Sequence, residues 1–159
     1  MPVKLLAIVV FCAAVVTAAA CSSDEPQTEL EVGDVEIRVS SSAFEEGGDI
    51  PVKQTCDGTD LSPSLSWSGI PSDTKSIALV VDDPDAPVRT WVHWVLYGLP
   101  ADAAGLREGV QAGDTLAEGG RQGVTDFGKR EYGGPCPPKG GPHRYFFKVY
   151  ALDRQGTLT

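Results

Sequence analysis

The middle of the chain carries the segment SIALVVDDPDAP at residues 76–87. Residues 76–81 form a nearly continuous apolar run with β-branched members, which predicts a central strand buried on both faces. The carboxylates and prolines that follow end this strand, because proline lacks the N–H group that a sheet needs. Polar side chains are therefore expected to gather where the strand meets its loop.

Other segments predict further strands around this one. Residues 35–39 alternate apolar and charged side chains, as a strand with one wet face does. Apolar stretches at 65–67, 91–99 and 144–152 predict three more strands. Residues 101–130 hold seven glycines and show no sustained helical period, which indicates a loop region. The pattern predicts an all-β fold, mainly an antiparallel β-sandwich with long loops.

Composition limits the possible classes of protein. A chain of 159 residues suits one domain, and its 42% apolar and 22% charged residues allow a buried core, which argues against a disordered protein. The formal net charge of −9 argues against a sequence-independent nucleic-acid binder, since such proteins neutralise phosphates with Lys and Arg. Nucleic acid is therefore not an expected partner.

Residues 1–20 have the features of a secretory signal peptide. Lys4 precedes an apolar run at residues 5–16, and small residues lead up to Cys21. The apolar run is too short for a membrane span. We expect this segment to be removed on export.

The cleavage site resembles a bacterial lipobox. In AAAC, residues 18–21, Cys21 would be lipidated and become the new N-terminus. Ordinary signal peptidase would cut the same bond and release a soluble secreted or periplasmic protein. Residues 21–29 are polar and acidic, as expected of a tether, so the folded domain is expected at 30–159. We predict an exported lipoprotein, attached to the cell membrane through Cys21.

Two of the four cysteines remain in the exported domain after this cleavage, Cys56 and Cys136. An even pair in an oxidising compartment favours a disulfide. Two buried free thiols or a metal-binding pair are the alternatives. No CxxC motif or nearby His supports a zinc site, and we expect neither a metal nor a cofactor.

A second polar cluster, YGGPCPPKGGPHRY, spans residues 132–145. Together with residues 82–87 it contains or adjoins both His residues of the chain, His93 and His143. Prolines stiffen the walls of such a site, and imidazoles, Tyr132 or Tyr145 can donate hydrogen bonds to a small anion or a phosphorylated head group.

Each of these residues also has a purely structural interpretation. Asp82 could be a turn residue that bonds its own backbone. His93 could be a hydrogen-bonded core imidazole. Arg144 could pair with an acidic neighbour.

Several motifs together resemble the phosphatidylethanolamine-binding protein family. They are DPDAP at 83–87, HWV at 93–95, GPCPPKG at 134–140 and HRY at 143–145. Within the family they are similar to the bacterial Raf-kinase-inhibitor-like (YbhB/YbcL-type) branch. Motifs CDG at 56–58, SPSLSW at 62–67 and TDFG at 125–128 fit the same branch, so the resemblance covers about residues 35–152.

This resemblance implies a β-sandwich with a small pocket for phosphate-like groups. The pocket residues that it assigns to this chain are Asp83, Asp85, His93, Pro138, His143 and Tyr145. The family's C-terminal helix and last strand have no counterpart here, so we expect the domain at 30–159 to be C-terminally incomplete.

The implied function is that of a non-enzymatic binding protein for a small phosphorylated ligand at the cell envelope, with a further protein partner left open. The alternative is a hydrolase of phospho- or acyl-esters that uses Asp83, Asp85, His93 and His143 as acid and base. No nucleophile-elbow serine and no HExxH motif supports that alternative.

Overall fold

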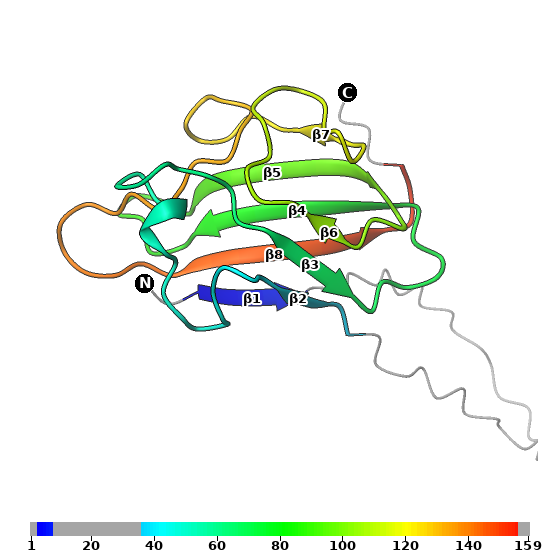
Figure 1. Ribbon diagram of the computed structural model, residues 1–159, viewed down its shortest axis with the longest axis horizontal. Coiled ribbons are helices and arrows are strands. Elements are labelled where there is room, and N and C mark those ends of the chain that lie inside the picture. The colour runs from blue at the N-terminus through cyan, green and yellow to red at the C-terminus, as the bar shows by residue number, and fades with distance from the viewer. Residues whose placement is uncertain (1–2, 8–35, 156–159) are drawn as a thin grey trace, which may run out of the picture.

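The computed structural model describes residues 3–7 and 36–155, which form two layers of β-sheet (Figure 1). The larger sheet has the strand order β1-β8-β4-β5-β7, and the smaller has the order β2-β3-β6. The strands of the larger sheet are β1 (Val3–Ala7), β8 (Tyr145–Leu152), β4 (Ser76–Asp83), β5 (Trp91–Pro100) and β7 (Arg121–Gln122). Those of the smaller are β2 (Arg38–Ser40), β3 (Leu65–Ser68) and β6 (Gly105–Leu106), and one 3-10 turn, η1, spans Val52–Gln54.

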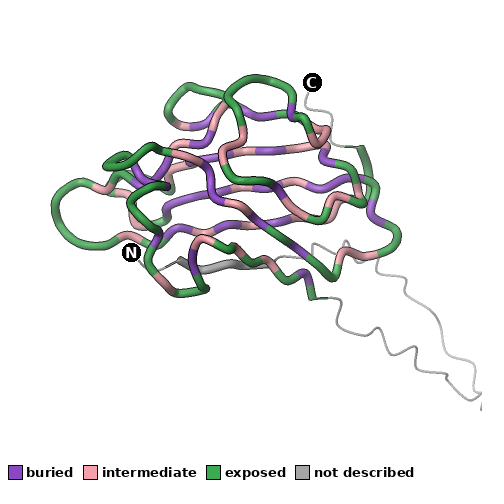
Figure 2. Tube along the Cα trace, in the orientation of Figure 1, coloured by how far each residue is buried: buried purple, intermediate pink, exposed green. Residues whose placement is uncertain are grey.

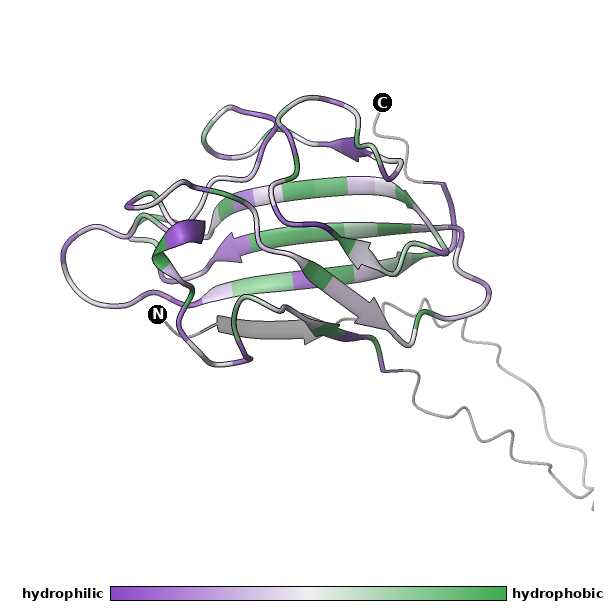
Figure 3. Ribbon diagram, in the orientation of Figure 1, coloured by the Kyte–Doolittle hydropathy of each residue, from purple (hydrophilic) through white to green (hydrophobic). Residues whose placement is uncertain are grey.

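Strand β4 lies in the centre of the larger sheet, antiparallel to both β5 and β8. Its core-facing residues Ile77, Leu79 and Val81 are fully buried, whereas Ala78 and Val80 are half-buried. The prediction of burial on both faces was therefore wrong, because the smaller sheet covers one face of β4 and no second layer covers the other within the described residues (Figure 2). Figure 3 shows how the apolar middle of β4 gives way to a polar end at Asp82 and Asp83.

The core fills the space between the two sheets. Phe44 packs on Phe147 of β8 with ring centroids 5.5 Å apart, and Trp94 of β5 is fully buried. The Trp94 indole N–H donates to Oε1 of buried Gln122 at 2.8 Å. The Gln122 amide nitrogen in turn donates to the carbonyl of Gln111, so one buried side chain ties a long loop to the core.

Segments with low apolar content form short strands. Residues 101–130 are loop apart from the two-residue strands β6 and β7, in agreement with the sequence. Strand β2 has three residues and is shorter than expected, since it overlaps the predicted strand at 35–39 only at Arg38 and Val39. Its neighbour Ile37 is buried between the exposed Glu36 and Arg38, so the predicted alternation of burial is present.

The predicted export signal overlaps the described chain at one place. Strand β1 consists of residues within that signal and pairs in parallel with β8, with Val3 opposite Tyr145 and Ala7 opposite Val149. Cys21 and the tether at 21–29 lie outside the described residues. Within the part of the chain that is described, no helix has the length and hydropathy needed to cross a membrane.

Candidate functional site

The three long strands bring their polar termini to the same end of the sheet. Because β4 runs antiparallel to β5 and β8, its last residues lie beside the first residues of both neighbours. Asp83 is opposite Trp91 at the start of β5, and Asp82 is opposite Phe146 at the start of β8. The two polar clusters therefore meet, and Asp83 of the first contacts His143 of the second, 60 residues later in the sequence.

A pocket of about 230 Å³ opens at this end of the sheet. This is below the roughly 300–1,000 Å³ of sites for drug-sized molecules, so a small ligand or head group fits best. Five of the six predicted pocket residues line it, and Asp85 does not. The lining consists of Asp83, Ala86, Pro87, Trp91, His93, Phe127, Cys136, Pro137, Pro138, His143 and Tyr145.

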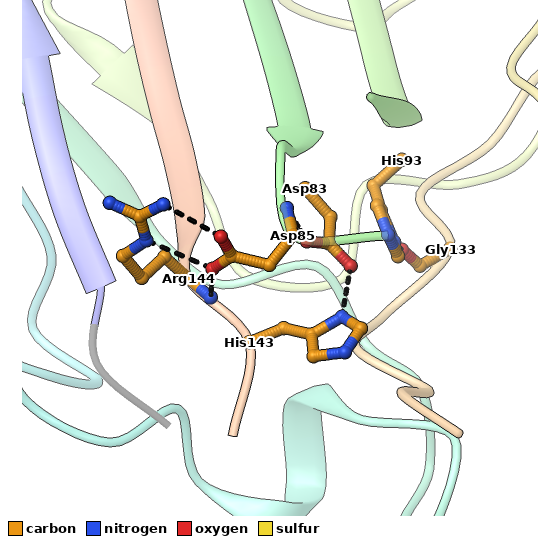
Figure 4. A network of polar contacts seen from close by, with 6 residues as sticks. All are labelled: Asp83, Asp85, His93, Gly133, His143 and Arg144. Atoms are coloured by element: carbon orange, nitrogen blue, oxygen red, sulfur yellow. Dashed lines mark hydrogen bonds and ion pairs between the residues drawn. The ribbon is translucent and has the colours of Figure 1, made fainter. Parts of the chain in front are cut away.

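Asp83 and His143 form a hydrogen-bonded pair in the wall of the pocket (Figure 4). The Nδ1 atom of His143 lies 2.7 Å from Oδ2 of Asp83, whose side chain is 5% exposed. The other carboxylate oxygen of Asp83 accepts the backbone N–H of Asp85 at 2.8 Å. Both oxygens of Asp83 are thus engaged, and the carboxylate orients the imidazole in the way that an acidic residue orients a catalytic histidine.

His93 reaches the pocket because of a β-bulge. Val81 of β4 pairs with Trp94 of β5, and the next residue of β4, Asp82, pairs with Val92. His93 therefore has no partner in β4 and is an extra residue of β5. Its Nδ1 lies 2.6 Å from the carbonyl oxygen of Gly133 and must donate the hydrogen, because a carbonyl can only accept.

The environment of His93 keeps its imidazole neutral near pH 7. Burial lowers its pKa, against the smaller raising effect of the Gly133 carbonyl and of Asp83. The ring packs edge-on against Phe127 and Tyr145, with centroids 5.3 and 5.1 Å away. His93 is therefore both a satisfied core imidazole and a pocket wall.

The side chain of Tyr145 lines the pocket, and its hydroxyl oxygen is buried. The residue is 1% exposed, and its oxygen makes no hydrogen bond of ordinary geometry with a described residue. Burial and the nearby charge of Asp83 raise its pKa, so the hydroxyl keeps its hydrogen. Tyr132, the other tyrosine considered as a donor, instead donates to the carbonyl of Gln54 at 2.9 Å and does not line this pocket.

Asp85 serves the site indirectly, through Arg144. Its carboxylate accepts hydrogen bonds from Nε, Nη2 and the backbone N–H of Arg144, at 2.9, 2.6 and 2.8 Å. These bonds hold the pKa of Asp85 well below its usual range. The ion pair fixes the backbone next to His143. The prediction that Arg144 pairs with an acidic neighbour is therefore confirmed.

Asp82 is not the turn residue that the sequence suggested. It is paired in β4 and projects from the opposite face to Asp83, since successive side chains of a strand alternate. There its Oδ2 accepts a hydrogen bond from Nζ of Lys148 at 2.6 Å.

The remaining wall of the pocket is tied down by a disulfide and by hydrogen bonds. Cys56 and Cys136 are bonded, with their Cα atoms 5.4 Å apart. The N–H of Cys56 donates to the carbonyl of Pro135, and the N–H of Gly134 donates to Asp60. The proline-rich segment is therefore anchored on the η1 region before it enters the pocket.

Two aromatic residues of the wall, Trp91 and Phe127, are absent from the predicted site. Their rings meet edge-on with centroids 5.6 Å apart. Phe127 is held by its neighbour Asp126, which accepts the N–H of Val92 at 2.7 Å and pairs with Arg89. The TDFG motif was the available signal for this loop, but its spacing alone does not reveal where the phenyl ring points.

The described residues include no cluster of three or more His, Cys, Asp or Glu able to hold a metal ion. Two other hollows of about 300 and 280 Å³ lie along the loop around residues 107–118. They contain no imidazole, and we regard the pocket of Asp83 and His143 as the candidate site.

Comparison with known proteins agrees with this architecture. Residues 40–158 match the phosphatidylethanolamine-binding protein family. A UPF0098 protein of Methanothermobacter thermautotrophicus is 50% identical over 117 residues, covering 74% of this chain and 77% of the relative. The UPF0098 protein YbcL of Escherichia coli is 49% identical over 105 residues, which cover 61% of this chain and 55% of YbcL.

Solved structures give the same result. The crystal structure of E. coli YbcL, described as a member of the mammalian PEBP family, has a TM-score of 0.72 and 38% identity, covering 77% of this chain and 80% of YbcL. The PEBP homologue CT736 of Chlamydia trachomatis has a TM-score of 0.69 and 39% identity, covering 77% of this chain and 79% of CT736. The chain therefore belongs to the phosphatidylethanolamine-binding protein family.

Proposed function

We propose that this protein is a non-enzymatic binding protein whose pocket accepts a small phosphate-like anion or phosphorylated head group at the cell envelope. The observation that carries the proposal is the convergence of His143, His93 and Tyr145 on one small, aromatic- and proline-walled pocket. A phenol O–H, or an imidazole that has gained a second proton, is a suitable donor for phosphate oxygens. The volume of about 230 Å³ suits a head group better than a large substrate.

The composition of the wall favours binding over covalent catalysis. No Ser, Thr or Lys lines the pocket among the described residues, and the one sulfur there, that of Cys136, is bonded to Cys56. The pair Asp83–His143 is the observation that favours the alternative, a hydrolase in which His143 activates water. Such an enzyme would need the pair but no protein nucleophile.

Titration of the untagged protein with inorganic phosphate and phosphoethanolamine tests the proposal. We expect saturable binding in which NMR resonances of pocket residues shift, and a loss of about tenfold in affinity in Tyr145→Phe, as for one hydrogen bond to a charged group. Lys139→Gln is the control, because it removes a charge from the same loop at a residue outside the pocket wall.

The two candidate functions differ in their outcomes. Absence of binding to both ligands would contradict the binding proposal. Turnover of 4-nitrophenyl phosphate or acetate that disappears in His143→Gln would favour the hydrolase.

The envelope location rests on the N-terminal sequence. We expect mass spectrometry of the exported protein to show a diacylglyceryl group on Cys21. An unmodified N-terminal cysteine would contradict lipidation and favour a secreted or periplasmic protein.

A further inference from the structure

One nitrogen of His143 is left for a ligand. Its Nδ1 carries a hydrogen, since Oδ2 of Asp83 at 2.7 Å is an acceptor. The ring makes no other hydrogen bond within the described part of the chain, and its side chain is 13% exposed at the pocket. The Nε2 atom lies on the side of the ring turned away from Asp83 (Figure 4). In the neutral ring this atom is an acceptor, which a fully deprotonated oxyanion such as sulfate cannot use.

The charges around His143 do not by themselves favour an anion. The titratable groups that face it are Asp83 from β4, Asp85 after β4, the adjacent Arg144, His93 from β5 and Tyr145 from β8. Asp126 and Arg89, next to the aromatic wall, form an ion pair with one another. Asp85 and Arg144 neutralise one another. His93 and Tyr145 are neutral near pH 7, because burial lowers the pKa of the first and raises that of the second.

With a neutral ring at His143, Asp83 therefore remains as the uncompensated charge in the pocket wall. A dianion that enters beside this buried carboxylate meets strong repulsion, because the interior screens charges poorly. A positive charge between the ligand and the Asp83 carboxylate would remove this repulsion. Histidine is the side chain that ordinarily gains a proton near neutral pH, and His143 lies in contact with Asp83 at the pocket.

We propose that the pocket takes up a proton together with its anion and that His143 receives it, an inference that rests on the proposed binding function. The proton comes from solvent and bonds to Nε2, while Nδ1–H continues to donate to Asp83. Nε2–H then donates to an oxygen of the ligand. The imidazolium lies between two negative groups, which is the arrangement that stabilises a charged histidine in Asp-His pairs.

This mechanism gives Asp83 a definite role. It is a positioning residue that orients His143 and stabilises its charged form, although its own charge repels the ligand. The pocket then selects for oxyanions and binds them more tightly as pH falls, with a limit of tenfold in affinity per pH unit for one proton.

Sulfate is the decisive probe, because it does not titrate between pH 6 and 8 and any proton taken up must reside on the protein. We expect its affinity for the full-length, untagged protein to increase at least tenfold from pH 8 to pH 6. Calorimetry at pH 8 in buffers of different ionisation enthalpy should show uptake of close to one proton. The chain has two histidines, so their imidazole ¹⁵N signals can be assigned, and saturation with sulfate should convert His143 to imidazolium while His93 stays neutral.

A matched pair of variants completes the test. In His143→Gln the amide can still donate to Asp83, but we expect proton uptake to vanish and the pH dependence of sulfate affinity to flatten. Lys139→Gln should keep the proton uptake of the parent protein. Circular dichroism checks that both variants are folded, and the NMR measurement on the parent protein does not depend on either of them.

The outcomes separate this inference from the proposed function. Sulfate binding without proton uptake would overturn the inference and leave the binding function intact. Proton uptake with phosphate, but no binding of sulfate, would place the proton on the ligand and overturn the role of His143. Failure of both anions to bind at any pH from 6 to 8 would contradict the binding function itself.

Discussion

The imidazole of His143 donates to the carboxylate of Asp83 across 60 residues of sequence, at a distance of 2.7 Å. Asp83 ends β4 and His143 precedes β8, so the contact exists because these two strands are adjacent and antiparallel. The bond joins the two polar clusters of the chain into one site. Its position at the wall of a small pocket makes it the centre of the proposed function.

Replacing Tyr145 with Phe should separate stability from binding. Its buried hydroxyl has no hydrogen-bond partner of ordinary geometry, so its removal should leave the free energy of unfolding unchanged or raise it by about 1 kcal/mol. Tyr132→Phe is the matched control, because its hydroxyl donates to Gln54 and its loss should cost about 1–3 kcal/mol. Urea unfolding of the two variants measures both effects, and equal destabilisation would contradict the prediction.

Gly134 should tolerate no side chain. A Cβ atom there would lie 2.3 Å from both the carbonyl oxygen of Gln54 and Oδ1 of Asp60. We expect Gly134→Ala to lower the free energy of unfolding by about 2 kcal/mol or more, the range for overpacking, and to weaken ligand binding by displacing the proline-rich wall. Gly140→Ala, in the same segment with open space around it, should match the parent protein in thermal unfolding and in binding.

Protonation of His93 should destabilise the fold in acid. Burial lowers its pKa in the folded protein, so the unfolded chain binds the proton more readily. The stabilising contribution is present above the ordinary pKa of about 6.5 and is lost as pH falls from there through the lowered pKa. It amounts to at most about 2 kcal/mol between pH 7 and pH 5, the limit for one proton.

The variant His93→Asn isolates this effect, since the amide nitrogen can donate to Gly133 and does not titrate. We expect its free energy of unfolding to decrease less than that of the parent protein between pH 7 and pH 5. Identical decreases in denaturant titrations would rule out His93 as the source.

Removing the disulfide should cost about 4 kcal/mol in the chain-entropy model, because Cys56 and Cys136 close a loop of 80 residues. The double variant Cys56→Ala, Cys136→Ala should also bind phosphate more weakly, since Cys136 lines the pocket. Dithiothreitol should reproduce both effects in the parent protein and change nothing further in the double variant. A parent protein whose thermal unfolding is insensitive to reduction would contradict this prediction.

Much of the larger sheet could be predicted from local sequence patterns. The apolar runs at 76–81, 91–99 and 144–152 correspond to β4, β5 and β8, because continuous apolar segments bounded by proline and glycine have few alternatives to a buried strand. The polar residues that follow or precede these runs therefore lie at the ends of strands, and they mark the site.

The orientation of individual side chains could not be predicted in this way. Asp82 and Asp83 are adjacent and chemically identical, yet one pairs with Lys148 on the outer face and the other enters the pocket. Phe127 lies far from the other wall residues in sequence and reaches them through the bonds of Asp126. Such placements depend on neighbours that are remote in the chain.

The sequence by itself thus determined that this chain forms a β-sandwich of the phosphatidylethanolamine-binding protein type, since strand periodicity and motifs are local properties. The tertiary structure decided which groups meet. A β-bulge leaves His93 unpaired and buried on the pocket side next to Trp94, although simple alternation would place the two side chains on opposite faces. The bulge arises from the register between β4 and β5, and register is a relationship between two strands that neither strand's residues specify alone.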